Sequence, residues 1–231
     1  MLRDWDSLPE FIKVPEVKPY YNILNKHRIS LILKRIFDIL FSCILIILLA
    51  VPMLFLAIII KIESPGPIFY MQERVTTYGK KFKIHKFRTM VKNADKIGST
   101  ITVWNDSRVT KVGRIIRRFR IDELPQVLDV LSGNMSFVGT RPEVPKYVEQ
   151  YTPEMRATLL MPAGITSEAS IRYKDENKLL NDVDDIDMVY LTKVLPEKMK
   201  WNLKSIRNFT LLHEISTLIR TIVVVLGKDY K

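Results

Sequence analysis

The longest apolar run of the chain covers residues 39–60, twenty-two consecutive positions without a charged side chain. Soluble core helices rarely sustain such a run, and it is long enough to cross the hydrocarbon core of a bilayer. A cleavable signal peptide fits poorly, because the run begins late, is too long and is not followed by a small-residue cleavage site. The pattern therefore predicts a membrane helix.

Basic residues flank this segment on both sides. Lys34 and Arg35 precede it, and Lys61 and Arg74 are among those that follow. Because cytoplasmic flanks are enriched in Lys and Arg, both ends favour the cytoplasmic side. A helix that enters the membrane, breaks at Pro52 and returns would satisfy this preference. A kinked helix that crosses the bilayer is the alternative, since proline is tolerated there, and the charges leave both open.

The remaining periodicity predicts an α/β domain that is rich in helices and has a small sheet. In chain order the predicted elements are an irregular arm with a basic amphipathic end (1–35), the membrane helix (36–62), a turn (64–67), strands (68–72 and 80–90), helices (109–120 and 124–131, the latter capped by Gly133), a strand and turn that present Arg141 (136–143), a further turn (162–166), a solvated loop (169–177) and a helical C-terminus (203–226). Residues 63–231 would form the main domain, with amphipathic helices at its C-terminal end.

Positive charge is concentrated in the middle of the chain. Residues 61–120 hold 15 Lys and Arg against 4 Asp and Glu, while the other 171 residues carry 21 of each kind, so this block accounts for the net charge of +11. Such a block indicates a polyanionic partner: nucleic acid, anionic lipid headgroups or a phosphorylated small molecule. The single cysteine excludes an internal disulfide, and Walker and Rossmann phosphate loops are absent from the sequence.

Two adjacent carboxylates, Asp122 and Glu123, follow a group of arginines at the predicted start of a helix. Unpaired amides and nearby guanidinium groups favour an ionised carboxylate there, so Asp122 could act as a nucleophile while the same groups receive phosphate oxygens. The alternative is structural: Asp122 caps the helix and Glu123 complements its dipole. The spacing alone leaves both interpretations open.

Several short segments occur in a characteristic order. They are Lys34-Arg35, Ser64-Pro65-Gly66-Pro67, Lys86-Phe87-Arg88-Thr89-Met90, Asp122-Glu123-Leu124-Pro125-Gln126, Met135-Ser136-Phe137-Val138-Gly139 with Arg141-Pro142, and Gly164-Ile165-Thr166. In these segments, over residues 31–226, the chain resembles the bacterial sugar transferases, the short-form monotopic polyprenyl-phosphate phosphoglycosyl transferases that start surface-glycan assembly.

The resemblance implies a re-entrant helix that keeps the enzyme on the cytoplasmic face of the bacterial inner membrane. It implies transfer of a sugar 1-phosphate from a UDP-sugar to undecaprenyl phosphate through a covalent aspartyl phosphosugar, with release of UMP and a requirement for Mg²⁺. The product would begin an O-antigen, capsule, exopolysaccharide or glycoprotein glycan. Membrane lipids are implied partners and nucleic acid is not. The alternatives are an inactive membrane scaffold of glycan assembly and a membrane-anchored nucleic-acid binder.

The resemblance also assigns roles to individual residues. Asp122 would be the nucleophile and Glu123 the metal ligand. The expected phosphate and substrate contacts are Lys86, Arg88, Arg117, Gln126 and Arg141. Asp187 and Tyr190 resemble a late Asp-x-x-Tyr element to which we assign no role.

Three departures from the family pattern stand out. Val51 precedes Pro52 where Ser is usual, and Thr140 replaces the first proline of a Pro-Arg-Pro turn, which affects how Arg141 is aimed. Residues 167–173 also differ from the common sequence, and we expect this difference to bear on sugar choice.

Overall fold

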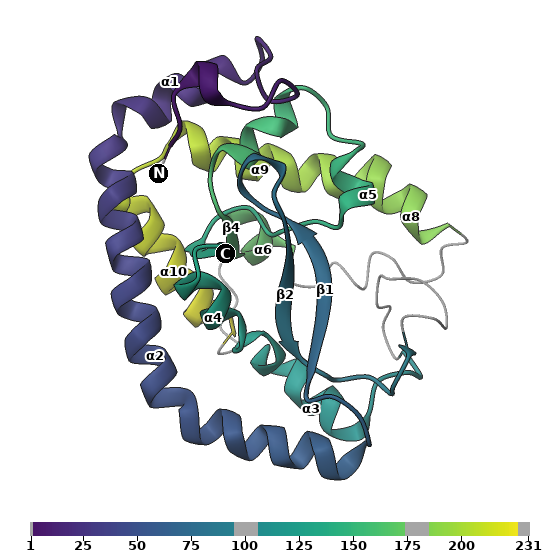
Figure 1. Ribbon diagram of the computed structural model, residues 1–231. Helices are drawn as coiled ribbons and strands as arrows, with labels where there is room; N and C mark the ends of the chain where they lie inside the picture. Colours follow the sequence, from purple (N-terminus) through teal and green to yellow (C-terminus); the bar gives the residue numbers. More distant parts are fainter. Residues whose placement is uncertain (1, 95–105, 174–184, 226–231) are drawn as a thin grey trace.

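The longest element of the fold is helix α2 (Arg28–Glu63), which curves around one side of the molecule (Figure 1). The computed structural model describes residues 2–94, 106–173 and 185–225. Short helices and two small sheets lie inside the curve of α2 (Figure 1). The prediction of a helix-rich domain with a small sheet and one long apolar helix is confirmed.

The described strands form two separate two-stranded sheets. Strands β1 (Phe69–Val75) and β2 (Lys81–Phe87) pair antiparallel, joined by the turn η2 (Thr77–Gly79). Strands β3 (Met135–Val138) and β4 (Ala163–Thr166) pair in parallel. The prediction of a turn over 162–166 was wrong, because residues 163–166 form strand β4. Gly164 was interpreted as a turn residue, but it instead permits close packing against Gly139.

Gly139 and Gly164 lie face to face where β3 ends. Gly139 N donates to Thr166 O at 2.9 Å, and Gly164 N donates to Thr140 O at the same distance. A Cβ atom on Gly164 would lie 2.1 Å from Gly139 N, so a side chain cannot be accommodated there. This close approach fixes the backbone from which residue 141 projects.

Helices connect and cover the strands. Between β2 and β3 lie α3 (Lys111–Arg118), the 3₁₀ turn η4 (Ile121–Glu123) and α4 (Gln126–Leu131). The remaining helical elements are η1 (Trp5–Ser7), α1 (Lys18–Lys26), α5 (Pro145–Val148), η5 (Glu154–Leu160), α6 (Glu168–Arg172), α8 (Ile186–Val189), η6 (Tyr190–Val194), α9 (Leu195–Arg207) and α10 (Leu211–Val225). The helices predicted over 109–120 and 124–131 are confirmed, and Gly133 follows α4 with φ of 84°.

Two C-terminal predictions need correction. Residues 168–172 form α6 rather than a solvated loop, because Ala169 is buried against the domain; residues 174–177 lie outside the described part of the chain. The predicted helical stretch 203–226 is two helices. The break falls at Asn208-Phe209-Thr210, where the ring of Phe209 is 2% exposed and the hydroxyl of Thr210 accepts from His213 N.

The N-terminal residues belong to the largest hydrophobic core rather than to an irregular arm. Their buried side chains are Leu8, Ile12, Val17, Tyr20, Tyr21 and Leu24. This core also contains residues of η5 and α9, such as Leu160 and Met199, so α1 packs against the domain. The earlier expectation failed because three prolines in the first 19 residues obscured the apolar periodicity of residues 18–26.

Helix α2 bonds the domain near both of its ends. Near the first, the Lys34 ammonium donates to Val138 O at 2.8 Å, and Arg35 Nη1 donates to Val130 O at 2.7 Å. At the other end, Val112 N donates to Glu63 Oε1 at 2.9 Å, and Ile60 is buried with residues of β2 and α3. Pro52 lies inside α2, which is one helix from Arg28 to Glu63 and is bent so that both of its ends reach the domain (Figure 1).

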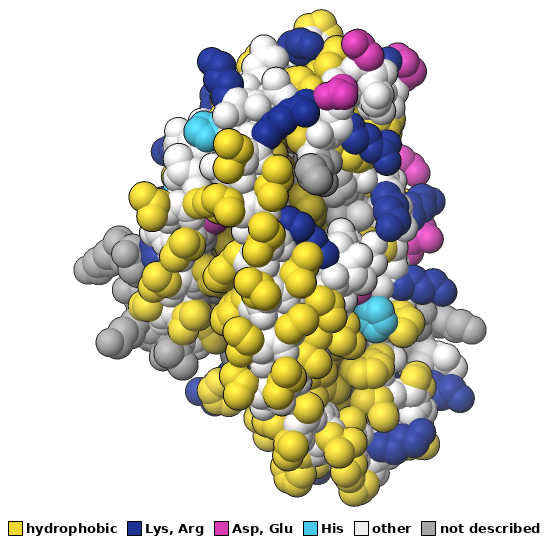
Figure 2. All heavy atoms as spheres, turned by 60° about the vertical axis from the view of Figure 1, so that its left-hand side comes forward, with side chains coloured by type: hydrophobic (Ala, Val, Ile, Leu, Met, Phe, Trp, Pro, Cys, Tyr) yellow, Lys and Arg dark blue, Asp and Glu magenta, His cyan; other side chains and the backbone are white. Residues whose placement is uncertain are grey.

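The outer side of α2 is apolar over its whole length. Only 11% of its most apolar 18-residue window is buried, so these side chains do not form a protein core, and the helix is long and apolar enough to cross a membrane. Figure 2 shows the hydrophobic surface that results. Helix α10 adds exposed apolar residues, including Leu212 and Ile219. In water such a surface would be a strong aggregation liability.

Candidate active site

The two carboxylates singled out in the sequence lie in the turn η4, between α3 and α4. The turn begins after Arg120, whose φ of 56° is in the left-handed region. A non-glycine residue in this conformation carries strain of roughly 1–3 kcal/mol, and such strain is often found at functional sites. The residue at the cap position of α4 is Pro125, so the capping interpretation of Asp122 does not hold.

Glu123 is held by two cations. Arg141 Nη1 donates to Glu123 Oε2 at 3.2 Å and its Nη2 donates to Oε1, while the Lys86 ammonium lies 3.2 Å from Oε1. Burial alone would raise the pKa of Glu123, but the charges of Arg141 and Lys86 outweigh it and hold that pKa well below its usual range. Glu123 is therefore ionised at neutral pH, with its charge neutralised locally.

Asp122 differs from Glu123 in its hydrogen bonding and in the direction of its pKa shift. Its Oδ1 atom is buried and has no hydrogen-bond partner in the described part of the chain. Burial and then the charge of Glu123 raise the pKa of Asp122, whereas Lys86 and Arg117 act in the opposite direction. An oxygen that is poorly solvated and unbonded is suited to attack an electrophile once the carboxylate is ionised.

Lys86 is positioned by two contacts between β2 and α4. The preceding residue, His85, donates its backbone N–H to Asp129 Oδ2 at 2.9 Å, and its ring Nδ1 lies 2.8 Å from Asp129 Oδ1. These contacts fix β2 against α4 and place Lys86 beside Glu123. Burial lowers the pKa of Lys86 to about 8, although Glu123 partly offsets it.

The other predicted basic residues differ in position. Burial lowers the pKa of Arg117, and the charge of Asp122 is the largest influence in the opposite direction, so Arg117 belongs to the site. Arg88 does not: its guanidinium donates to the carbonyls of Ser64 and Pro65, beneath the turn that follows α2. The geometry gives no support to a phosphate contact for Arg88.

Gln126 follows Asp122 by one helical turn and is fully buried. Neither its amide nitrogen nor its amide oxygen has a partner among the described residues. An unsatisfied buried amide costs about 1–3 kcal/mol, which a bound water or a substrate group would relieve. Its predicted role as a substrate contact is compatible with this position.

Sequence reasoning missed a second group of buried charges behind Arg141. Arg74 Nη1 donates to Pro142 O at 3.0 Å, and the Tyr190 hydroxyl donates to Glu143 Oε1 at 2.6 Å. Lys198 Nζ donates to the same hydroxyl at 3.0 Å. Tyr190 had been noted in an Asp-x-x-Tyr element without a role, and the charged pair in Arg141-Pro142-Glu143 was a signal for Glu143, but nothing local marked Lys198.

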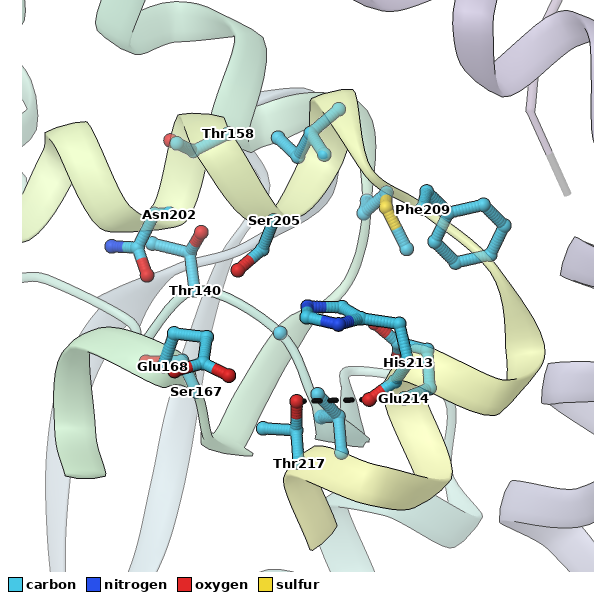
Figure 3. A pocket seen from close by; sticks show the side chains of 14 residues that line it. Thr140, Thr158, Ser167, Glu168, Asn202, Ser205, Phe209, His213, Glu214 and Thr217 are labelled. Atoms are coloured by element: carbon cyan, nitrogen blue, oxygen red, sulfur yellow. Dashed lines mark hydrogen bonds between the residues drawn. The ribbon is translucent and has the colours of Figure 1, made fainter. Parts of the chain in front are cut away.

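A small cavity lies near the ends of β3 and β4, between α9, α10 and α6 (Figure 3). Its volume of about 30 Å³ is far below that of a sugar, and its lining does not include Asp122 or Glu123. It is lined by Thr140, Glu168, Asn202, His213, Glu214 and Thr217, among others, and the Thr217 hydroxyl donates to His213 O at 2.9 Å (Figure 3). A cavity of this volume has room for one or two water molecules.

The donor set at the site can be compared with what Mg²⁺ requires. The described residues contain no group of three or more His, Cys, Asp or Glu side chains that could hold a metal ion. Mg²⁺ often binds through one or two carboxylates together with substrate phosphates and water, and Glu123 supplies that minimum. Glu123 Oε2 accepts from Arg141 Nη1 and has a second lone pair, so the residues fit a metal shared with a phosphorylated substrate.

Comparison with known proteins assigns the chain to a family. Residues 29–228 match the family described as "Bacterial sugar transferase". The chain belongs to the bacterial sugar transferase family. The match covers α2 and the residues of the site, so the carboxylate turn lies inside the family region.

Curated relatives name the chemistry of this family. The chain is 36% identical over 197 residues to the UDP-N-acetylgalactosamine-undecaprenyl-phosphate N-acetylgalactosaminephosphotransferase of Aeromonas hydrophila, covering 84% of this chain and 44% of that protein. It is 43% identical over 160 residues to a putative undecaprenyl-phosphate N-acetylgalactosaminyl 1-phosphate transferase of Bacillus subtilis, covering 68% and 87%. It is 36% identical over 192 residues to the UDP-glucose:undecaprenyl-phosphate glucose-1-phosphate transferase of Escherichia coli, covering 80% and 41%.

Two features of these matches limit what can be inferred from the relatives about this chain. The chain spans less than half the length of the Aeromonas and Escherichia relatives. The relatives' names also give different sugars, N-acetylgalactosamine and glucose. Membership of the family therefore does not identify the sugar for this chain.

Proposed function

We propose that this protein transfers a sugar 1-phosphate from a UDP-sugar to undecaprenyl phosphate at the cytoplasmic face of the bacterial inner membrane. The observation that carries the proposal is the unpartnered oxygen of Asp122, buried beside a Glu123 whose charge is already neutralised by Arg141 and Lys86. The names of the relatives support the acceptor and the kind of group transferred.

In the proposed first step, an Asp122 carboxylate oxygen attacks the phosphorus that bears the sugar. The new O–P bond forms as the bond to UMP breaks, and UMP leaves with its electron pair. In the second step a phosphate oxygen of undecaprenyl phosphate attacks the same phosphorus and releases Asp122. Both steps develop charge on phosphoryl oxygens, which Lys86, Arg117 and Arg141 are placed to stabilise. Mg²⁺, held by Glu123 and phosphate oxygens, would supply further charge neutralisation.

The proposed placement at the membrane is a re-entrant α2. Support comes from the contacts at its ends, since Lys34 and Glu63 both bond the same domain. A helix that crossed the bilayer would separate its ends by about 30 Å of hydrocarbon, and one compact domain could not then contact both. With this placement Asp122 would face an acceptor whose phosphate lies at the interface while its chain stays in lipid.

Release of UMP from a panel of UDP-sugars is the direct test of the proposed reaction. With purified protein, undecaprenyl phosphate and Mg²⁺, we expect at least one donor to release UMP in an amount equal to the lipid-linked sugar diphosphate formed. Inertness toward a panel of UDP-glucose, UDP-galactose and their N-acetylated forms would count against it. Tight, strongly salt-dependent binding of DNA or RNA would favour the competing function of a nucleic-acid binder.

The pKa of Lys86 predicts an alkaline limit to activity. Because this pKa is lowered to about 8, the ammonium loses its proton as the pH rises through that value, and the site loses one positive charge. We expect kcat/KM to fall above about pH 8. In Lys86→Arg the side chain stays protonated, so the decline should move upward by more than one pH unit. An unchanged alkaline limb in this variant would show that another group controls it.

A further inference from the structure

The backbone that carries Arg141 is held by contacts from outside its own turn. Thr140 precedes it, and unlike proline a threonine does not fix its own φ by a ring. The backbone carbonyl of Thr140 accepts from Gly164 N, and the two residues that follow Arg141 are held by further contacts. Arg74 Nη1 donates to Pro142 O at 3.0 Å, and Val75 N donates to Glu143 O at 3.0 Å. The end of β1 therefore fixes the turn from one side.

The Glu143 carboxylate fixes the turn from the other side. It accepts from the Tyr190 hydroxyl at 2.6 Å and lies 3.7 Å from the Lys198 ammonium and 3.9 Å from Arg74 Nη1. Lys198 in turn donates to the Tyr190 hydroxyl at 3.0 Å. Glu143, Tyr190 and Lys198 are each no more than 5% exposed. Water therefore cannot replace a lost contact easily.

Burial makes this arrangement stiff. Two cations and a tyrosine hydroxyl surround one carboxylate in a region of low dielectric, where polar interactions are stronger than in water. Loss of one contact leaves a buried charge partly unpaired, and the chain relaxes to recover solvation. The residue directly before this network is Arg141, whose guanidinium bonds Glu123.

We propose that Arg74, Glu143, Tyr190 and Lys198 form a positioning network that holds Arg141 in place to bind the donor's phosphates. The network links β1, the start of η6 and the first turn of α9 to the turn after β3. Arg141 is the point at which this network reaches the Asp122–Glu123 pair. The choice of ligand, a nucleoside diphosphate, rests on the proposed function. The contacts of the network do not depend on it.

The test compares two neighbouring tyrosines whose hydroxyl groups bond different carboxylates. Tyr190→Phe removes the hydroxyl that bonds Glu143. Tyr147→Phe is the matched control: its ring lies 4.9 Å from that of Tyr190, but its hydroxyl donates to Asp187. We expect Tyr190→Phe to lower kcat/KM for the UDP-sugar about tenfold and to weaken UDP binding, measured by calorimetry, about tenfold. Tyr147→Phe should change each less than twofold.

A double variant shows whether Tyr190 acts through Arg141. In an Arg141→Lys background, Tyr190→Phe should cost less than twofold further, because the guanidinium it positions is gone. An additional tenfold loss in that background would overturn the proposal, as would equal effects of the two tyrosine variants. UDP binding requires no turnover, so a chain that binds UDP but transfers no sugar would refute the proposed reaction and still decide the role of the network.

Discussion

Replacement of Asp122 by Asn is expected to abolish sugar-phosphate transfer while leaving the fold intact. The amide is nearly the same size as the carboxylate but is not a nucleophile, so the O–P bond of the first step cannot form. Removal of a covalent nucleophile lowers kcat by roughly 10⁴-fold or more in well-studied enzymes. Wild-type protein given the UDP-sugar without lipid should carry one phosphosugar per chain by mass spectrometry, and Asp122→Asn should carry none.

The unfolding temperature of the same variant is a second measurement, and its direction of change can be predicted. Because the pKa of Asp122 is raised in the folded state, the ionised carboxylate destabilises the fold at neutral pH. This loss of stability is absent below the pKa that Asp122 has in the unfolded chain. It appears as the pH rises through the pKa of Asp122 in the folded state. We therefore expect Asp122→Asn to unfold at the same temperature as wild type or above it at pH 7.

The control for this experiment is an acid-to-amide change away from the site. Glu73 on β1 is exposed and pairs with Lys81, so Glu73→Gln should keep full activity and full adduct formation. Normal turnover by Asp122→Asn would refute the covalent mechanism. A variant that is inactive because it has unfolded would be recognised by its lowered melting temperature.

The second large effect is expected at the buried ion pair between Lys34 and Glu214. The two side chains are in contact and are 6% and 8% exposed, and the Lys34 ammonium also donates to Val138 O. Lys34→Met leaves a buried carboxylate without its cation, which typically costs about 3–5 kcal/mol. For a chain of this size we expect the melting temperature in detergent to fall by about 10 °C.

Two further variants separate the ion pair from general damage to α2. Lys61→Met makes the same change on the same helix at an exposed lysine that bonds Gly66 O, and should lower the melting temperature by less than 2 °C, a surface-sized effect. The double variant Lys34→Met with Glu214→Leu removes both charges and should recover most of the loss. If Lys34→Met proved no more harmful than Lys61→Met, the pair would contribute little to stability.

The periodic elements and the position of the Asp122–Glu123 pair could be predicted because their signals are local. Strand β2 alternates polar and apolar residues over its first five positions, 81–85, and α3 has regular helical spacing. Asp122 and Glu123 stood out as adjacent acids directly after arginines, and the structure places them beside Lys86, Arg117 and Arg141. Their roles came from the resemblance, since the spacing alone also allowed a helix cap.

What could not be predicted depends on partners distant in the chain. Lys34 looked like a charge that flanks a membrane helix, but its partner Glu214 is 180 residues away. The break between α9 and α10 was hidden because Phe209 continues the apolar pattern while filling the core, and no glycine or proline marks the turn. Arg88 matched a basic element of the family, yet its guanidinium bonds the turn after α2, a contact no local pattern indicates.

The contacts between α2 and β3 also bear on how the chain is made. Asp38 Oδ1 accepts from Phe137 N at 3.2 Å and Lys34 donates to Val138 O, so side chains of the apolar helix satisfy backbone groups of a buried strand. Those groups would otherwise be left without partners. The helix is synthesised first, and β3 leaves the ribosome much later. With α2 placed in the membrane as proposed, completion of the domain would wait on a helix that is already inserted, and folding would be coupled to membrane insertion.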